Sequence, residues 1–273
     1  MQFTKHRAQI YNKETWYWQA GPDKKPAVIL LHGFSGTHEG MAPMADSLKG
    51  WRLIIPDLPG CGLSQPLKGK HTLENYSLWL DDFLQALGLG EVIVVGYSFG
   101  ARLALAFSSS RPHKVKKLVL ITPAVRAETF IARLSLLAFT ITEILPLHLQ
   151  KKWLFNRLFK GVSNKIIFKS SGKKRRQKLI AMDALAVKSL DIRANIEMFD
   201  EFYRSESLIN GEKIHVPTLI IAGDKDEVAT VKSVTELQAR FSNAELKIMK
   251  SSGHILVLER PSATGNIIHN WLK

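Results

Sequence analysis

The stretch VVGYSFGAR, residues 94–102, joins an apolar run to a helical pattern through one serine, Ser98, that lies between two glycines. A buried strand favours branched apolar side chains, and a helix interior disfavours glycine. The glycines two positions before and after Ser98 therefore indicate a turn too tight for a Cβ on either side. A serine in such a turn projects its hydroxyl out of the strand, and the rest of the chain decides whether that hydroxyl has a chemical use.

Short apolar runs alternate with helical patterns along the chain. Runs that suit buried parallel strands occur at residues 27–31, 52–55, 91–95, 117–121, 218–222 and 246–249. Helical patterns occur at residues 72–87, 98–110, 230–241 and 262–272. The alternation predicts an α/β fold, a mostly parallel twisted sheet with helices on both faces. Residues 2–19 are expected to form a β-hairpin at the edge of this sheet.

The alternation stops after Pro123 and resumes near His215. Between these residues only helical patterns occur, and the segment is too long for a structureless loop in a compact domain. We therefore predict a core of residues 1–123 and 211–273, interrupted by a helical cap, or lid, at residues 124–210.

The composition is that of a globular chain. Its 273 residues are 45% hydrophobic, which is enough for a large core. Cys61 is the only cysteine and no Cys/His spacing resembles a zinc site, so we expect no intrachain disulfide, no metal and no other cofactor. The first residues lack the apolar segment of a secretory signal, and no run of 18 apolar residues occurs. The expected location is the cytoplasm, either free or at the periphery of a membrane.

The positive charge is concentrated in one segment. The formal net charge is +14, and residues 125–180 contain thirteen Lys and Arg against two Glu. Such a local excess indicates an anionic partner, either an anionic membrane surface or an acidic carrier protein. The alternative is that the charges only keep the cap soluble. Nucleic acid is not expected, because no recognised nucleic-acid module accompanies the charge.

Ser98 has the sequence context of a nucleophile elbow. Its G-x-S-x-G motif follows a predicted strand and opens a predicted helix. A serine hydroxyl needs a base and an orienting carboxylate, which follow it in the order Asp or Glu, then His. His254, after the last predicted strand, is the candidate base. The remaining histidines outside the motifs, His71 among them, are interpreted as surface or capping residues. The loop after Ala222 offers Asp224, Asp226 and Glu227 as the acid.

Five segments resemble those of the α/β-hydrolase superfamily, and the likeness extends over nearly the whole chain: LLHGF, DLPGCGLS, VGYSFG, GDKDEV and SGH followed by ERP. The resemblance implies that Asp226 is the acid, with Asp224 in reserve. It also implies an oxyanion hole made by the backbone N–H groups of Phe34 and of Phe99, the residue after the nucleophile.

The chain departs from the family pattern at two places. Ala101 replaces a frequent second glycine after Ser98, and the loop after Asp226 lacks the usual proline, reading Val228-Ala229-Thr230. Alanine is small enough to be tolerated at the first position. The second departure weakens the register on which the assignment of Asp226 depends.

The resemblance also implies acyl chemistry, because the epoxide hydrolases and haloalkane dehalogenases of this superfamily have an aspartate where this chain has Ser98. The resemblance favours a carboxylesterase or thioesterase that forms an acyl-enzyme and takes a small-molecule ester or thioester with an apolar acyl group. Fold and triad leave lactonase, amidase and C–C bond hydrolase open. LHGFSG together with Arg102 also resembles the menaquinone-pathway synthase, a lyase that eliminates pyruvate, although this arginine can simply brace a helix. A non-catalytic binding protein on a hydrolase scaffold is a further alternative.

The predicted cap carries the candidate substrate contacts. Residues 130–160 are apolar and aromatic with basic flanks, so they suit an acyl-chain pocket. We take Phe130, Leu134 and Trp153, together with Arg102, as candidate substrate-binding residues. The alternative is that these apolar residues only pack the cap against the core.

Overall fold

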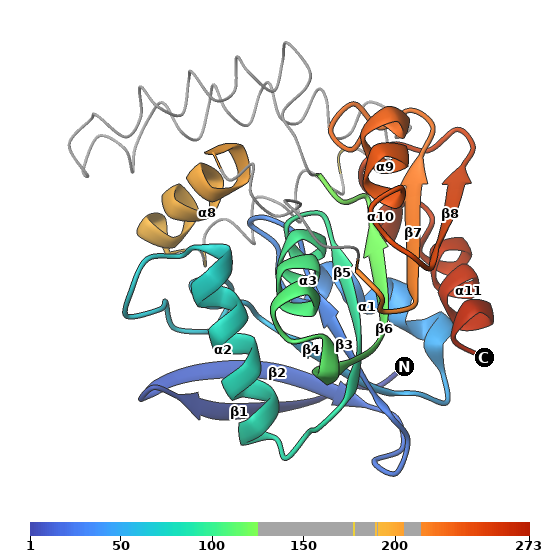
Figure 1. Cartoon of the computed structure of the whole chain (residues 1–273). Coiled ribbons are helices and arrows are strands. Elements are labelled where there is room, and N and C mark those ends of the chain that lie inside the picture. The colour runs from blue at the N-terminus through green and yellow to red at the C-terminus, as the bar shows by residue number, and fades with distance from the viewer. Residues whose placement is uncertain (125–176, 178–188, 190, 205–213) are drawn as a thin grey trace.

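A computed structural model gives the structure of the protein, and it describes residues 1–124, 177, 189, 191–204 and 214–273. In this part of the chain eight strands form one twisted sheet in the order β1-β2-β4-β3-β5-β6-β7-β8 (Figure 1). The strands are β1 (Thr4–Ile10), β2 (Lys13–Ala20), β3 (Ala27–Leu31), β4 (Arg52–Pro56), β5 (Val92–Tyr97), β6 (Val115–Ile121), β7 (Thr218–Gly223) and β8 (Ala244–Met249).

The six strands from β3 to β8 run parallel, and the β1–β2 hairpin is antiparallel at one edge. All five residues of β3 are buried, as expected for a central strand covered on both faces. The predicted α/β fold, with its mostly parallel sheet, is therefore confirmed.

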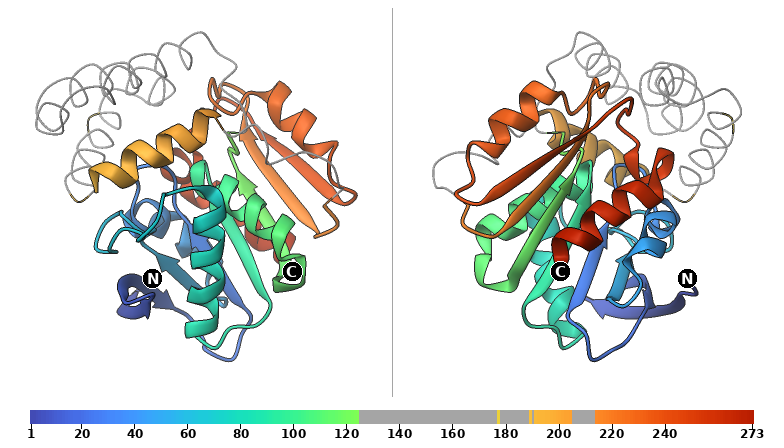
Figure 2. Two further views of the ribbon diagram at one scale, coloured as in Figure 1. Left: turned by 60° about the vertical axis from the view of Figure 1, so that its left-hand side comes forward. Right: turned by 90° about the vertical axis from the view of Figure 1, so that its right-hand side faces the viewer.

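Helices cover both faces of the sheet, as two further views show (Figure 2). Successive residues of a strand point to opposite faces. On β3, Ile29 and Leu31 join the cluster formed with α2 (Leu73–Ala86), α3 (Phe99–Ser110) and α9 (Val231–Gln238). Val28 and Leu30 join the opposite cluster, formed with α1 (His38–Ala45), α10 (Leu256–Glu259) and α11 (Pro261–Leu272). Short 3-10 turns lie at Asp46–Leu48 and Pro112–Lys114.

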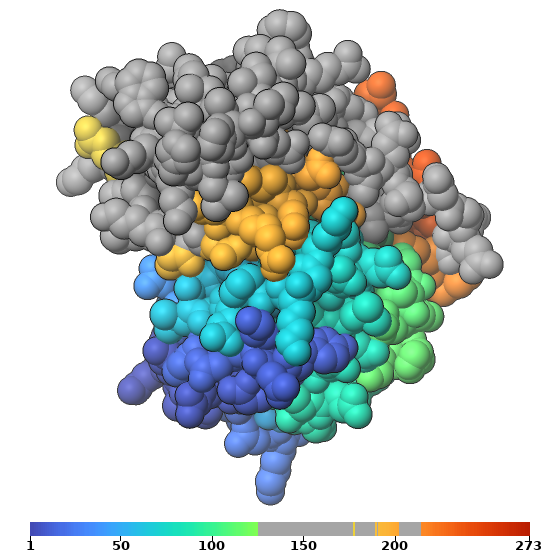
Figure 3. Space-filling view, turned by 90° about the vertical axis from the view of Figure 1, so that its left-hand side faces the viewer, coloured from blue at the N-terminus to red at the C-terminus, as the bar shows by residue number. Residues whose placement is uncertain are grey.

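One helix of the predicted cap segment lies within the described residues. Helix α8 (Ile192–Arg204) lies across the end of the sheet at which the parallel strands terminate (Figure 1). A space-filling view shows α8 resting on the part of the core that contains α2 and the loop before it (Figure 3). Apart from residues 124, 177, 189 and 191, the rest of the predicted cap lies outside the described residues, and the division at residues 124 and 210 stays a prediction.

None of the helices in the described part of the chain is long and apolar enough to cross a membrane. Among the same residues, no group of three or more His, Cys, Asp or Glu side chains is placed to hold a metal ion.

Candidate active site

Ser98 lies at a sharp corner between β5 and α3. Its backbone has φ of 52° and ψ of −111°, a left-handed conformation that side-chain-bearing residues rarely adopt. The sheet holds this corner from one side, because the Ser98 N–H donates to the Ile121 carbonyl of β6 at 2.9 Å. The helix holds it from the other, since the Ser98 carbonyl accepts from the Ala101 N–H at 3.0 Å. Strain of this kind at a polar residue is typical of a functional site.

The two flanking glycines are required by close packing of the backbone. A Cβ on Gly96 would lie 2.2 Å from the carbonyl oxygen of Gly100. A Cβ on Gly100 would lie 2.3 Å from the carbonyl oxygen of Leu31. Both distances are far inside van der Waals contact, so neither position admits a larger residue without a shift of the backbone.

The corner brings Ser98 to His254 and Asp226. The Ser98 hydroxyl lies 2.9 Å from His254 Nε2, and His254 Nδ1 lies 2.9 Å from Asp226 Oδ2. A carboxylate only accepts hydrogen bonds, so Nδ1 carries the proton and Nε2 is free to accept the serine proton. All three residues are buried: Ser98 is 7% exposed, and Asp226 and His254 are each 6% exposed. Water therefore competes little for these hydrogen bonds.

The geometry distinguishes the two candidate aspartates. Asp226 Oδ1 accepts the N–H groups of Val228 and Ala229 at 2.8 and 2.9 Å, which directs its other oxygen to His254. Asp224 Oδ1 instead accepts the N–H of Ser252 at 3.1 Å, so it joins the two loops rather than the imidazole.

Thr122, at the end of β6, links the backbones that carry the serine and the histidine. It is completely buried and has a left-handed φ of 44°. Its hydroxyl donates to the His254 carbonyl at 3.2 Å, and its neighbour Ile121 accepts the Ser98 N–H. Sequence reasoning did not single out Thr122, and a threonine after a buried strand gives no special signal.

The loop after β3 carries the first expected oxyanion donor, Phe34. The Gly33 carbonyl is bonded to His32 Nδ1 at 2.8 Å and to the Gly36 N–H at 3.0 Å. His32 Nε2 accepts the Leu58 N–H at 2.9 Å, so the proton of this imidazole is on Nδ1. Burial lowers the pKa of His32, which favours this neutral form. In a planar trans peptide the C=O and the following N–H point in opposite directions, so the Phe34 N–H points away from His32.

Phe99 provides the second expected donor. It is the first residue of α3, and the first N–H groups of a helix have no acceptor within the helix. Within the part of the chain that the structure describes, neither Phe34 nor Phe99 donates its N–H to a backbone carbonyl in a loop or cap. Both groups therefore suit an oxygen that develops negative charge beside Ser98.

Arg102 lies one helical turn beyond Ser98 and is buried, with 1% of its surface exposed. Its Nη1 donates to the Ala124 carbonyl at 2.9 Å and its Nη2 to the Glu201 carbonyl of α8 at 3.2 Å. Burial lowers the pKa of Arg102 to about 10. These contacts support the bracing interpretation of Arg102. The other candidate substrate-binding residues, Phe130, Leu134 and Trp153, lie outside the described residues.

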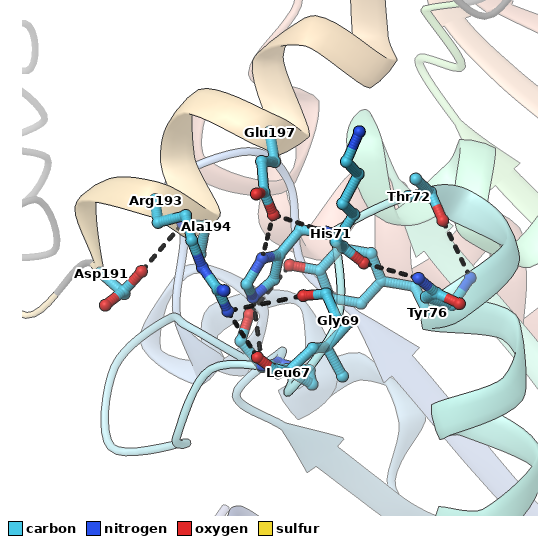
Figure 4. A network of polar contacts seen from close by, with 12 residues as sticks. Leu67, Gly69, His71, Thr72, Tyr76, Asp191, Arg193, Ala194 and Glu197 are labelled. Carbon is cyan, nitrogen blue, oxygen red and sulfur yellow. Dashed lines mark hydrogen bonds and ion pairs between the residues drawn. The ribbon is translucent and has the colours of Figure 1, made fainter.

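Helix α8 also docks on the loop before α2 through a polar network (Figure 4). Glu197 Oε2 accepts the backbone N–H and Nδ1 of His71 at 2.7 and 2.8 Å. His71 Nε2 accepts the Leu67 N–H at 3.1 Å, and Arg193 donates to the Leu67 carbonyl at 2.6 Å. The interpretation of His71 as a surface or capping residue is wrong, because its side chain is completely buried in this network. Its partner Glu197 is 126 residues away in sequence, so no local pattern could reveal the pair.

Comparisons with known proteins place this geometry in context. A family model described as "alpha/beta hydrolase fold" matches residues 26–165. The chain is similar to Lipase 3 of Moraxella sp. (strain TA144), with 27% identity over 241 residues, covering 88% of this chain and 75% of the lipase. It is equally similar to a Bacillus subtilis (strain 168) protein provisionally named 2-succinyl-6-hydroxy-2,4-cyclohexadiene-1-carboxylate synthase, with 27% identity over 271 residues and 92% of each chain covered.

Among solved structures, the enol-lactonase from Burkholderia xenovorans LB400 superposes with a TM-score of 0.83 at 19% identity. The superposition covers 98% of this chain and 99% of the lactonase. At this identity the likeness concerns the fold.

Proposed function

Because the chain belongs to the alpha/beta hydrolase family, we propose that it hydrolyses carboxylic esters or thioesters with Ser98 as nucleophile, His254 as base and Asp226 as orienting acid. The observation that carries this proposal is the continuous pair of 2.9 Å contacts from Ser98 through His254 to Asp226. The similarity to Lipase 3 supports an ester as the substrate class. Under this proposal the protein is a hydrolase of EC class 3.1.

The reaction begins when Ser98 Oγ attacks the carbonyl carbon of the ester and its proton passes to His254 Nε2. The carbonyl oxygen becomes an oxyanion, which the N–H groups of Phe34 and Phe99 stabilise by hydrogen bonds. Asp226 stabilises the imidazolium through Nδ1. His254 then gives the proton to the leaving alcohol or thiol, the C–O or C–S bond breaks, and an acyl-serine remains.

Water completes the cycle by the same groups. His254 removes a proton from the water as its oxygen attacks the acyl carbon, and a second tetrahedral oxyanion forms in the same place. When this intermediate collapses, Ser98 Oγ leaves and regains its proton from His254. The products are a carboxylic acid and the free serine.

An apolar acyl group suits the surroundings of residues 33–36, the loop after β3 that we call the oxyanion loop. The rings of Phe34 and of Phe199 on α8 lie with centroids 5.8 Å apart, and Phe199 is 3% exposed. Such an aromatic pair favours a hydrocarbon over a charged group. Phe130, Leu134 and Trp153 remain candidates for the same pocket.

We also infer a docking role for the basic segment, residues 125–180. Its charge supports association with an anionic membrane surface or an acidic carrier protein, which would make the enzyme peripheral to a membrane rather than free in the cytoplasm. The substrate would then be drawn from the surface to which the enzyme binds.

The test of the ester-hydrolase proposal is labelling of the purified protein with a fluorophosphonate, followed by turnover of p-nitrophenyl esters and acyl-CoA thioesters of graded chain length. We expect labelling and turnover in the wild type, and the loss of both in Ser98→Ala, because a phosphonylating probe needs an activated serine. Wild-type turnover that survives in Ser98→Ala would contradict the assignment of the nucleophile. A folded wild type without labelling or turnover would favour a binding protein.

One observation favours a second candidate, a pyruvate-eliminating lyase. The Bacillus subtilis relative has the same 27% identity as the lipase, and the match covers more of both chains. In a lyase the same His254 and Ser98 pair would remove a proton from the substrate without forming an acyl-enzyme. Release of pyruvate from an anionic substrate that carries a pyruvate-derived leaving group, with no ester hydrolysis, would select this candidate. The burial of Arg102 against two carbonyls weighs against it as a binding site for the substrate anion.

A further inference from the structure

A buried side chain of α8, Asn195, is hydrogen-bonded to the loop that carries the expected oxyanion donor. Asn195 is 2% exposed, and its Nδ2 donates to Ser35 Oγ at 2.9 Å. Ser35 follows Phe34 directly in the chain but lies 160 residues from Asn195. The contact therefore joins two segments that the sequence keeps far apart, next to the group proposed to stabilise the oxyanion.

The backbone of Ser35 has an unfavourable conformation that the hydrogen bond from Asn195 helps to stabilise. Its φ of 53° is left-handed, which is unfavourable for a residue with a Cβ. On one side the turn is closed by the Gly36 N–H, which donates to the Gly33 carbonyl at 3.0 Å. Asn195 holds the Ser35 side chain from the other side. The Phe34 N–H belongs to the Gly33–Phe34 peptide, whose carbonyl accepts the Gly36 N–H. Ser35 lies inside the turn that this bond closes, so a change in its conformation is passed to the peptide that carries the Phe34 N–H.

Two sides of α8 contact two different loops of the core. Residues four apart in a helix lie on the same side. Asn195 and Phe199 contact the oxyanion loop, residues 33–36, whereas Arg193 and Glu197 contact the loop before α2. Docking of the helix and contact with the oxyanion loop can therefore be altered independently.

If Asn195 served only to pack α8 against the core, an asparagine would be energetically unfavourable there. Within the described part of the chain its buried Oδ1 has no hydrogen-bond partner. A buried polar atom without a partner destabilises the folded state, and an apolar side chain of the same size would avoid this. Residues that function requires often reduce stability in this way.

We propose that Asn195 is a positioning residue that holds the oxyanion loop, through Ser35, in the conformation that directs the Phe34 N–H toward the reacting carbonyl. This inference rests on the proposed ester hydrolysis. Asn195 does not touch the reacting atoms and acts only through the Phe34 N–H. Because that N–H stabilises the oxyanion, which forms in the transition state, a change at Asn195 should lower kcat rather than weaken substrate binding.

The test compares Asn195→Leu, Ser35→Ala and the double variant with wild type, using p-nitrophenyl butyrate as substrate. We expect kcat to fall about ten- to a hundredfold in Asn195→Leu, less than the loss of a whole oxyanion donor, with KM changed by no more than about twofold. The Tm should change little, because removal of the unpaired amide oxygen offsets the loss of the hydrogen bond to Ser35. The double variant should lose little more than Ser35→Ala alone, since both changes break the same contact.

The matched control is Arg193→Ala, which removes an α8 contact on the other side of the helix. We expect it to lower Tm and to leave kcat close to the wild-type value. Hydrogen–deuterium exchange of the amides of residues 33–36 gives a readout that does not depend on turnover. Exchange there should be faster in Asn195→Leu than in wild type. Asn195→Ala replaces Asn195→Leu if the leucine variant does not fold.

The proposal is overturned if Asn195→Leu keeps wild-type kcat, if it and Arg193→Ala lower kcat equally, or if exchange in the loop is unchanged. Ser98→Ala separates this failure from failure of the proposed function. Loss of turnover in Ser98→Ala beside a fully active Asn195→Leu would refute only the positioning role. If the wild type hydrolyses no ester, the exchange experiment still decides whether Asn195 holds the loop.

Discussion

The loop after β7 contains two aspartates only two positions apart, and they have different partners. Asp226 is directed to the imidazole by the two N–H groups that its other oxygen accepts. Asp224 bonds the backbone of the neighbouring loop. A substitution of aspartate by asparagine removes a negative charge at either position with almost no change in size, so the pair allows a controlled comparison.

We expect Asp226→Asn and His254→Ala each to lower kcat for ester hydrolysis by ~10³ or more, because the imidazole loses its correct tautomer or is absent. Asp224→Asn is the matched control, and it should retain most of the wild-type kcat. Steady-state kinetics on one p-nitrophenyl ester, with circular dichroism to verify folding, measures all three variants. If Asp224→Asn lowered kcat more than Asp226→Asn does, Asp224 rather than Asp226 would be the orienting acid.

The departure from the family pattern after Asp226 has a structural explanation. Thr230 stands in the loop that lacks the usual proline, and it is the N-cap of α9, where its hydroxyl accepts the Ser233 N–H at 3.2 Å. Capping by threonine satisfies an N–H of the first turn, so α9 begins without the proline. The N–H groups of Val228 and Ala229, which lie between Asp226 and this cap, orient the Asp226 carboxylate.

The strands and the long helices could be predicted because their patterns are local. The predicted strand 27–31 has the bounds of β3, and the predicted hairpin is present as β1 and β2. Helix α1 was not predicted, since Gly40 and Pro43 lie inside it and both are poor helix formers. It forms because Met41 and Met44 are completely buried against the sheet. Tertiary packing outweighs helix propensity at this position.

The residues of the candidate site also fall into two groups, those that a local sequence pattern predicts and those that it does not. Ser98 and His254 could be assigned because each stands at a strand end in a fixed order along the chain. Asn195 and Thr122 could not, because an asparagine in a helix or a threonine after a strand has no distinguishing pattern. Their contacts span 160 and 132 residues, and only the folded chain brings such groups together.

The docking of α8 should depend on pH through His71. Burial lowers the pKa of this histidine below its ordinary value of 6.5, although the carboxylate of Glu197 acts in the opposite direction. The unfolded chain therefore binds the proton more readily than the folded chain. The stability contributed by the neutral imidazole is fully present above pH of about 6.5 and is lost as the pH falls below it.

We expect the free energy of unfolding to fall between pH 7.5 and pH 5.5 by less in His71→Gln than in wild type, because glutamine does not titrate. Urea denaturation at the two pH values measures this difference. His113→Gln, which changes an exposed histidine, is the matched control and should keep the wild-type pH dependence. An equal fall in wild type and His71→Gln would show that His71 is not the titrating group.

The charge of the protein as a whole is strongly uneven. Residues 125–180 hold thirteen basic residues, while the lysines of the described core are dispersed along the chain and most of them are exposed. Attraction between a basic segment and anionic lipids is screened by salt over a distance of about 10 Å at 0.1 M ionic strength. A docking role for the segment must therefore weaken as salt is added.

We expect the protein to sediment with vesicles that contain anionic phosphatidylserine, and binding to fall as NaCl rises from about 50 to about 500 mM. Replacement of Lys173, Lys174, Arg175 and Arg176 by glutamine should weaken binding strongly. Replacement of the exposed Lys24, Lys25, Lys232 and Lys250 by glutamine, which removes the same charge from the core, should have little effect. Absent or salt-insensitive binding would leave solubility as the only role of the segment.

Because of Thr122, the backbones that carry Ser98 and His254 are held in place before substrate binds, and this affects how the reaction begins. Through Ile121 and its own hydroxyl, the end of β6 fixes the backbones of both Ser98 and His254 before any substrate arrives. An enzyme whose reacting groups are aligned in advance has no assembly step after mixing. If Ser98 and His254 act as proposed, we expect progress curves of ester hydrolysis that begin without a lag, which stopped-flow measurement would check.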